Sequence, residues 1–124
     1  MIPSPARRNP WTVVAIGYGI LIFVASMMPV DARVAPGQLD KIIHVCEYLL
    51  FAWLLVQAMR LSSSVQREYL LLWAWIYATS YGLLMELLQG LVPWRSCSLA
   101  DAAANAIGAA LGVWLGQRTG VRER

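Results

Sequence analysis

Charged residues are scarce in this chain of 124 residues: Asp, Glu, Lys and Arg make up 14% of it, against 59% hydrophobic residues. A soluble domain typically carries about 25% charged residues, and the mean hydropathy of this chain is +0.56. The lack of polar residues excludes an ordinary water-soluble domain. It also leaves no room for a soluble module beside the apolar stretches, so we expect a single domain, residues 1–124, built in the membrane.

Motifs for metal, phosphate and nucleophilic chemistry are absent as well. The chain has one histidine, His44, and neither an H-E-x-x-H pattern, a phosphate-binding loop nor a nucleophile elbow. The cysteines, Cys46 and Cys97, form no C-x-x-C pattern, so we interpret them as free thiols, with a disulfide open to them if both lie near the outer surface. We expect no cofactor and no bound metal.

Nucleic-acid binding is excluded by the distribution of the basic residues. The net charge is +3, but Lys and Arg are scattered in ones and twos between apolar stretches. Binding to phosphates needs a basic face, whereas scattered basic residues are typical of the cytoplasmic loops of membrane proteins.

What the chain does have is four apolar stretches, each close to the roughly 20 residues that cross a bilayer as a helix. The alternating pattern of a membrane β-barrel is missing, and an unpaired backbone is not tolerated in lipid, so the stretches should be helices. The sequence therefore predicts an all-α membrane protein, a four transmembrane helix bundle, with helices at about 11–28, 42–59, 69–92 and 99–116.

Lys and Arg are unevenly divided among the segments that connect these stretches. The N-terminal tail, the middle loop and the C-terminal tail hold seven of the ten, and the other two loops hold three. Since positive residues are enriched in cytoplasmic loops, the N-terminus and the C-terminus are both predicted to be cytoplasmic. The alternative, that the first stretch is a cleaved signal peptide, is disfavoured because no A-x-A site precedes Pro29.

The ionisable residues of the spans gather on the outer side of this predicted bundle. They begin the second helix, end the third and begin the fourth, all within about two turns of the outer surface. Such residues are functional candidates by default, because a charge at mid-membrane costs about 2.5–3.5 kcal/mol. We predict a polar pocket open to the outer leaflet, with the candidate residues Asp40, Lys41, His44, Glu47, Tyr48, Glu86, Gln89, Arg95, Asp101 and Asn105.

Small residues continue the polar face of the fourth helix inward. Gly108, Gly112 and Gly116 follow Asp101 and Asn105 at spacings of three or four residues. Because a ridge of small residues lets helix backbones approach closely, this stripe is predicted to pack against other helices rather than face lipid.

Two of the acidic residues also have a structural interpretation. Asp40 lies where the N-cap of the second helix belongs. Ser98 and Asp101 match a capping box, in which the acidic side chain bonds back to the start of the helix. Capping and ligand binding are compatible, because a cap fixes the position of the side chain.

Two interpretations stay open for His44 and two for Arg95. His44 is either a proton carrier or general base partnered by Glu47 or Glu86, or a neutral packing residue with a hydrogen bond. Arg95 is either the counter-ion of Glu86 or Asp101, or a clamp for an anionic headgroup through its planar guanidinium.

The order and spacing of these residues resemble a family signature. The run Asp40-Lys41-Ile42-Ile43-His44 with Tyr48 resembles the D-K-x-x-H-x-x-x-Y opening of the VanZ-like membrane proteins. Three later runs of this chain resemble the second half of that signature, namely Glu86-x-x-Gln89, Pro93-x-Arg95 and Asp101-x-x-x-Asn105-x-x-Gly108. The resemblance implies a bacterial cytoplasmic (inner) membrane protein, in a family named for a protein associated with teicoplanin resistance, and it supplies no reaction.

We therefore favour a non-enzymatic membrane protein whose pocket binds a lipid headgroup or another amphiphilic envelope ligand. Membrane lipids are its expected partners, and binding would affect envelope properties such as glycopeptide susceptibility. The alternative is a membrane-embedded acid–base hydrolase or transferase that acts on a lipid-linked substrate. A proton or ion pathway is disfavoured, because the polar residues do not continue to the cytoplasmic side.

Overall fold

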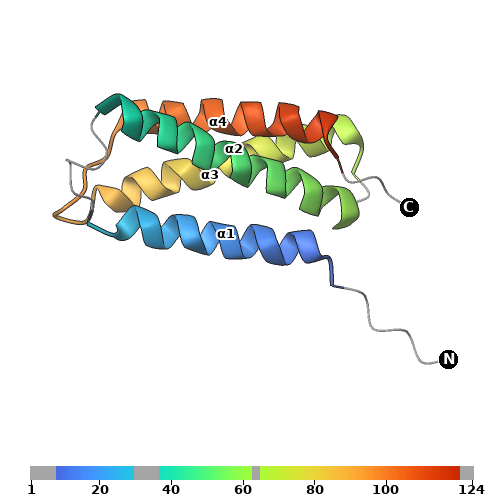
Figure 1. Cartoon of the computed structure of the whole chain (residues 1–124), viewed down its shortest axis with the longest axis horizontal. Helices are drawn as coiled ribbons and strands as arrows, with labels where there is room; N and C mark the ends of the chain where they lie inside the picture. Colours follow the sequence, from blue (N-terminus) through green and yellow to red (C-terminus); the bar gives the residue numbers. More distant parts are fainter. Residues whose placement is uncertain (1–7, 30–36, 63–64, 121–124) are drawn as a thin grey trace.

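The computed structural model describes residues 8–29, 37–62 and 65–120, and within these ranges the chain forms four helices. They are α1 (Pro10–Met27), α2 (Gly37–Ser62), α3 (Arg67–Gln89) and α4 (Leu99–Arg118). The helices lie side by side, with the start of α1 and the end of α4 at the same end of the bundle (Figure 1). Each helix is long and apolar enough to cross a membrane, which confirms the predicted four-helix transmembrane fold.

The starts of α1 and α4 follow from local sequence. The side chain of Asn9 accepts a hydrogen bond from the backbone N–H of Trp11 at 3.0 Å, and Pro10 takes the first helical position, where its missing N–H removes no bond. Ser98 caps α4, because its Oγ accepts from the N–H of Asp101 at 3.2 Å.

Two helices differ from their predicted bounds by three residues or more at one end, whereas α1 and α4 differ by at most two. α2 begins at Gly37 and ends at Ser62 rather than covering 42–59, and α3 covers Arg67–Gln89 rather than 69–92. The predicted N-cap role of Asp40 is therefore wrong, since this residue lies inside the first turn of α2. Hydropathy marks only the apolar part of a helix, whereas 26 residues span about 39 Å and reach into the headgroup region, where polar residues are tolerated.

Large apolar side chains point outward along all four helices. On α1 alone, Val13, Ile16, Ile20 and Leu21 are each more than half exposed. Exposed apolar surface on this scale is unfavourable in water, since burial of apolar area drives the folding of soluble proteins. The same surface suits contact with lipid hydrocarbon.

The closest contact in the bundle is between α2 and α4. A Cβ atom added to Gly108 would lie 2.3 Å from the carbonyl oxygen of Val45, and one added to Gly112 would lie 2.1 Å from that of Leu49. At Gly116 the nearest atoms belong to the side chain of Val56, at 3.0 Å. At Gly108 and Gly112 the glycine stripe of α4 therefore rests directly on the backbone of α2.

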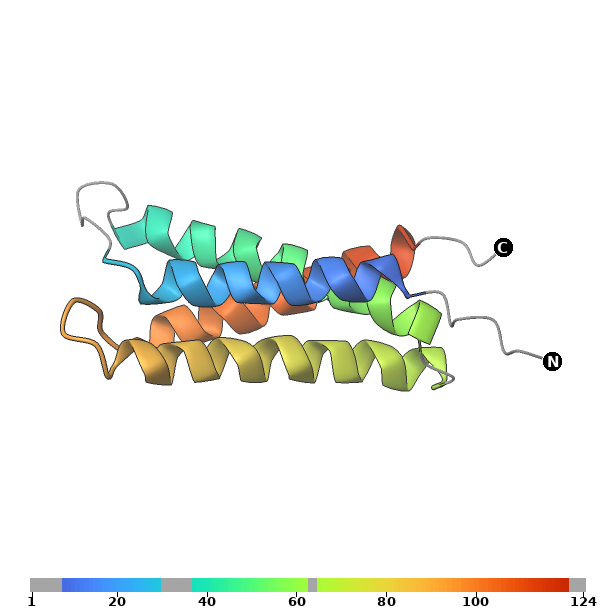
Figure 2. The same cartoon turned by 90° about the horizontal axis from the view of Figure 1, so that it is seen from below.

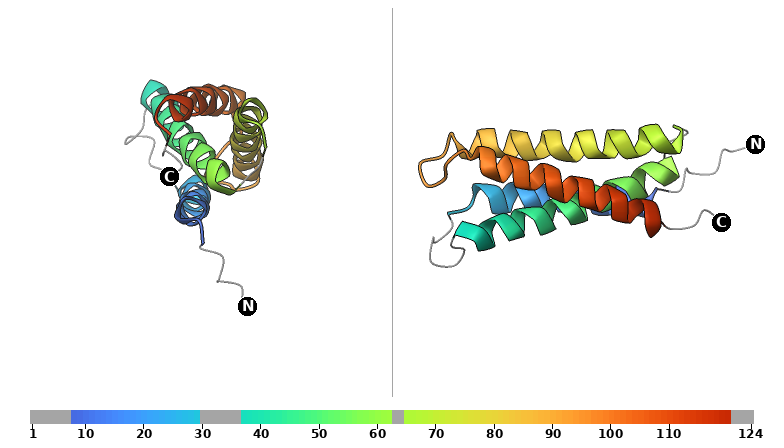
Figure 3. Two further views of the ribbon diagram at one scale, coloured as in Figure 1. Left: turned by 90° about the vertical axis from the view of Figure 1, so that its right-hand side faces the viewer. Right: turned by 90° about the horizontal axis from the view of Figure 1, so that it is seen from above.

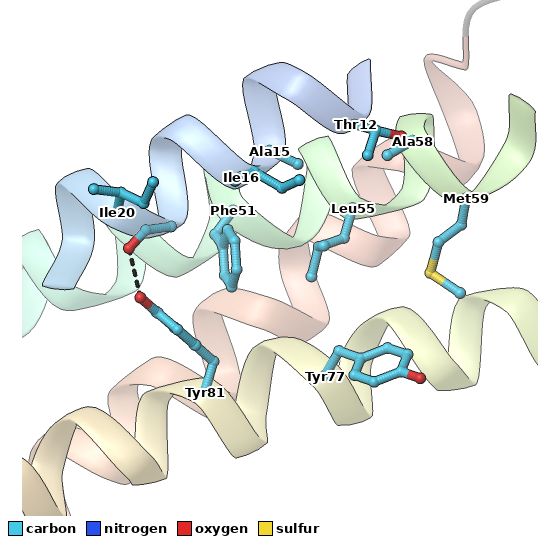
Figure 4. Close-up of a pocket in the computed structure, with 11 residues that line it drawn as sticks. Thr12, Ala15, Ile16, Ile20, Phe51, Leu55, Ala58, Met59, Tyr77 and Tyr81 are labelled. Atoms are coloured by element: carbon cyan, nitrogen blue, oxygen red, sulfur yellow. Dashed lines mark hydrogen bonds between the residues drawn. The ribbon is translucent and has the colours of Figure 1, made fainter. Parts of the chain in front are cut away.

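The first helix lies outside the group formed by α2, α3 and α4 (Figure 3, left) and between α2 and α3 when viewed as in Figure 2. An open apolar cavity of about 500 Å³ separates parts of α1, α2 and α3. Phe51 and Tyr81 line it, and the Tyr81 hydroxyl crosses it to donate a hydrogen bond to the carbonyl oxygen of Gly19 (Figure 4). This cavity is lined almost wholly by apolar groups, as expected of a surface that faces hydrocarbon.

Candidate functional site

The acidic residues and the histidine inside the predicted spans lie at one end of the bundle, which we call the polar end. It holds the end of α1, the first turns of α2, the end of α3, the α3–α4 loop and the first turns of α4 (Figure 2, left side). Helix order alone brings these segments together, because each successive helix runs back along the one before it.

The centre of the polar end is His44, which is only 8% exposed. Its Nε2 lies 3.7 Å from a carboxylate oxygen of Asp40, one turn earlier on α2, and 3.7 Å from one of Asp101 on α4. Its Nδ1 lies 3.0 Å from the side-chain oxygen of the buried Asn105. Lys41 Nζ lies 3.9 Å from the other carboxylate oxygen of Asp101. The imidazole is thus held by one amide, with two carboxylates on its far side.

Glu86 supports the start of α4 from the end of α3. One oxygen of this carboxylate, which is 1% exposed, accepts a hydrogen bond from the backbone N–H of Ser98 at 3.1 Å. In the predicted capping box Asp101 was to accept that N–H, and this prediction is wrong. Glu86 takes the role from another helix, which leaves the Asp101 side chain directed toward His44 and Lys41.

Two hydrogen bonds hold the end of α1 against the polar end. The Gln89 side-chain nitrogen donates to the carbonyl oxygen of Ser26 at 3.1 Å. The Trp94 indole nitrogen donates to the carbonyl oxygen of Met27 at 2.8 Å. Because both acceptors belong to the last turn of α1, two of its orphan carbonyl groups are satisfied by α3 and the α3–α4 loop.

A polar cavity of about 400 Å³ opens between these elements. Charged and polar side chains supply most of its exposed lining, which is unusual for a membrane-embedded helix bundle. Its lining residues are Asp40, His44, Gln89, Pro93, Trp94, Arg95, Ser96 and Asp101.

A second, smaller cavity of about 160 Å³ adjoins the polar cavity, because Asp40, His44 and Arg95 line both. The smaller cavity in turn shares Ala25 and Glu47 with an apolar groove of about 580 Å³ between α1 and α2. The polar cavity, the smaller cavity and the groove therefore lie next to one another in this order.

The ten predicted pocket residues divide into three groups. Half of them line the polar cavity, namely Asp40, His44, Gln89, Arg95 and Asp101. Glu47 lines the smaller cavity and the groove. The other four lie behind the cavity wall or outside it, and these are Lys41, Tyr48, Glu86 and Asn105. That any of the ten contacts a ligand stays a prediction.

Tyr48 departs furthest from its predicted place. Its ring is 1% exposed and packs edge-on against Phe51, with ring centroids 6.2 Å apart. It also contacts the helix backbone at Gly82, where an added Cβ would lie 3.0 Å from the tyrosine ring. Tyr48 is therefore a packing residue between α2 and α3, since its place on the polar face of α2 lies one turn below the cavity.

Arg95 has none of the ion pairs predicted for it. Among the described residues it forms no salt bridge within 4.0 Å, because Asp101 pairs with Lys41 and Glu86 accepts the Ser98 N–H instead. Its side chain lines both the polar cavity and the smaller one.

The cysteines Cys46 and Cys97 are both exposed and free of a disulfide.

Two serines of the site were missed by sequence reasoning. Ser96 lines the polar cavity, and Ser26 lines the smaller cavity while its carbonyl accepts from Gln89. Ser26 carried a signal, since it is a polar residue at the end of an otherwise apolar span. For Ser96 no signal separates it from an ordinary loop residue.

The four apolar helices define a multi-pass membrane protein, with a cluster of buried polar side chains at one end. A family model, VanZ/LLP1, matches residues 5–118. The chain therefore belongs to the VanZ/LLP1 family, as the spacing of its polar residues predicted. No curated protein and no solved structure matches it.

Proposed function

We propose that this protein binds an amphiphilic lipid of the bacterial envelope, with the headgroup in the polar cavity and the chain in the groove between α1 and α2. The observation that carries the proposal is that the smaller cavity lies between the polar cavity and the groove and has lining residues in common with each of them. A membrane amphiphile has the same two parts in the same order, a polar head joined to an apolar tail.

The chemistry of each part fits this division. The groove is lined by apolar residues, among them Leu21, Ile22 and Leu50, and burial of each methylene group there contributes about 0.8 kcal/mol. In the polar cavity Arg95 offers a planar fork of N–H donors suited to phosphate or carboxylate, and Asp40 and Gln89 offer acceptors and donors for hydroxyl groups.

A bound lipid should be recovered with the purified protein and lost when the cavity is changed. In Arg95→Gln we expect at least a tenfold drop in copurifying lipid, because a charge-assisted contact worth about 1.5–3 kcal/mol is removed. The measurement is a lipid inventory by native mass spectrometry. Arg118→Gln is the matched control, since Arg118 lies at the opposite end of the bundle over the ring of Trp114.

Either of two results would contradict this proposal. One is a lipid inventory that is the same in Arg95→Gln and in the wild type. The other is recovery of a cleaved headgroup in place of the intact lipid, which would point to a hydrolase or transferase at the same cavity.

The proposal places the polar end at the outer face of the bacterial cytoplasmic membrane, with both chain ends in the cytoplasm. The excess of Lys and Arg in the terminal and middle segments supports this orientation. We expect a fluorescent protein fused after residue 124 to fluoresce and alkaline phosphatase fused there to be inactive. Active phosphatase at that position would show that the orientation is inverted.

Through the bound lipid, the protein is proposed to influence envelope properties, with glycopeptide susceptibility as the phenotype. The resemblance to VanZ-like proteins supports the choice of teicoplanin as the test compound. Expression of the wild type should change teicoplanin susceptibility more than expression of Arg95→Gln at an equal protein level.

A further inference from the structure

From the geometry around His44 we infer that Asp40, His44 and Asp101 form a binding site for a divalent transition-metal cation of the Zn²⁺ type. The three side chains offer one nitrogen and two oxygen atoms, all within 4.8 Å of one another. The inference rests on the proposed function only in using the same polar cavity.

The hydrogen bond on the far side of the imidazole determines which nitrogen is available. Nδ1 of His44 lies 3.0 Å from the side-chain oxygen of Asn105, and an amide oxygen only accepts. This contact favours the tautomer with the proton on Nδ1, in which Nε2 presents its lone pair to the cavity. Metal-binding histidines are oriented in this way, by a second hydrogen bond from the nitrogen that does not bind the metal.

The arrangement of acceptor atoms in the cluster suits a cation. Nε2 of His44 faces a carboxylate oxygen of Asp40 and one of Asp101, and the three atoms lie within 4.8 Å of one another. Both separations from Nε2 are 3.7 Å, longer than the roughly 2.7–2.9 Å of a charge-assisted N–H···O bond, so neither carboxylate forms a close hydrogen bond with the ring.

The two separations from Nε2 lie close to those between ligands of one metal ion, and all three atoms lie within 4.8 Å of one another. With bonds of about 2.0–2.2 Å, donor atoms around a tetrahedral zinc lie about 3.3–3.6 Å apart. One imidazole and two carboxylates also match the ligand types that Zn²⁺ takes in proteins. Lys41 lies near the other oxygen of Asp101, so its ammonium group does not occupy the position proposed for the metal.

The site is incomplete as a structural zinc site, which needs four protein ligands. Among the described residues the cluster supplies three, and they line the polar cavity. The fourth position would open into that cavity, where water or the headgroup of a bound lipid completes the coordination. A dication would also balance the carboxylate of Asp40, since Lys41 pairs with Asp101.

The test is the metal content and metal response of the untagged full chain purified in detergent without chelators. We expect about one equivalent of Zn²⁺ by inductively coupled plasma mass spectrometry, and a rise in melting temperature when Zn²⁺ is added back after chelation. In Asp101→Asn, which keeps the size of the side chain, we expect at least a tenfold loss of Zn²⁺ affinity. His44→Gln should behave in the same way.

Glu68→Gln is the matched control, because Glu68 is an acidic residue in the first turn of α3, at the opposite end of the bundle from the cluster. It should keep the affinity of the wild type. Absence of bound metal together with no thermal response to Zn²⁺ would overturn the inference. An equal response in Asp101→Asn would also overturn it, since the zinc would then be held elsewhere, for instance by the exposed thiols of Cys46 or Cys97.

Failure of this inference can be told apart from failure of the proposed function. If lipid copurifies with the protein but no metal binds, the lipid proposal stands and the metal site does not. If one equivalent of metal binds but no lipid copurifies, the metal site stands and the lipid proposal does not.

Discussion

Alanine at Gly112 is expected to lower the free energy of unfolding in detergent by at least about 2 kcal/mol. The added methyl group would lie 2.1 Å from the carbonyl oxygen of Leu49, and inserting a methylene group into a close-packed core typically costs about 1–3 kcal/mol. Here the obstacle is backbone, which cannot rotate away as a side chain can, so α2 and α4 must move apart. Thermal or denaturant unfolding followed by circular dichroism measures the change.

Gly17→Ala is the control for this experiment. No atom lies within 4 Å of a Cβ added to Gly17 on α1, so the only effect expected is the higher helix propensity of alanine, up to about 1 kcal/mol of added stability. If Gly112→Ala were as stable as Gly17→Ala, the close contact between α2 and α4 would be wrong.

Glu86→Ala is expected to lower the free energy of unfolding by about 2–4 kcal/mol. The substitution leaves the backbone N–H of Ser98 without its acceptor, a loss of about 1–3 kcal/mol. It also opens a cavity where a side chain only 1% exposed had been. The same unfolding measurement applies.

Glu86→Gln separates these two contributions. Glutamine keeps nearly the same volume and an oxygen that accepts the Ser98 N–H, so its stability should lie much closer to that of the wild type. A loss as large in Glu86→Gln as in Glu86→Ala would show that the negative charge of Glu86, rather than the bond to Ser98, matters for stability.

The four helices were predictable because length and hydropathy are local properties of the chain. The polar start of α2 was not predictable in this way. Its residues 37–41 include Gln38, Asp40 and Lys41, and a search for apolar stretches leaves such residues out. Helical order then places the ends of the spans, which is why the polar residues were expected on one side. These predictions needed no knowledge of which helix contacts which.

The contacts between helices could not be read from the sequence in the same way. The glycine stripe predicted that α4 packs closely against something, but not that its partner is α2, two helices earlier. Nor did the sequence indicate that Glu86 accepts the backbone N–H of Ser98, because the spacing of a capping box points to an acid on the same helix, here Asp101. Local spacing therefore did not predict that the side chain of Asp101 lies beside His44.

The glycine stripe has a consequence for how the bundle assembles. Gly108, Gly112 and Gly116 recur at every turn of α4, so sliding α4 along α2 by one turn, about 5.4 Å, would bring Gly112 opposite Val45 and still leave a glycine at the contact. The stripe thus sets how near the two helices come but does not fix their register. A shift of one turn would move Asp101 and Asn105 away from His44. The polar contacts of His44 therefore distinguish the observed register of α2 and α4 from the shifted one. A buried polar group specifies register in the same sense in coiled coils.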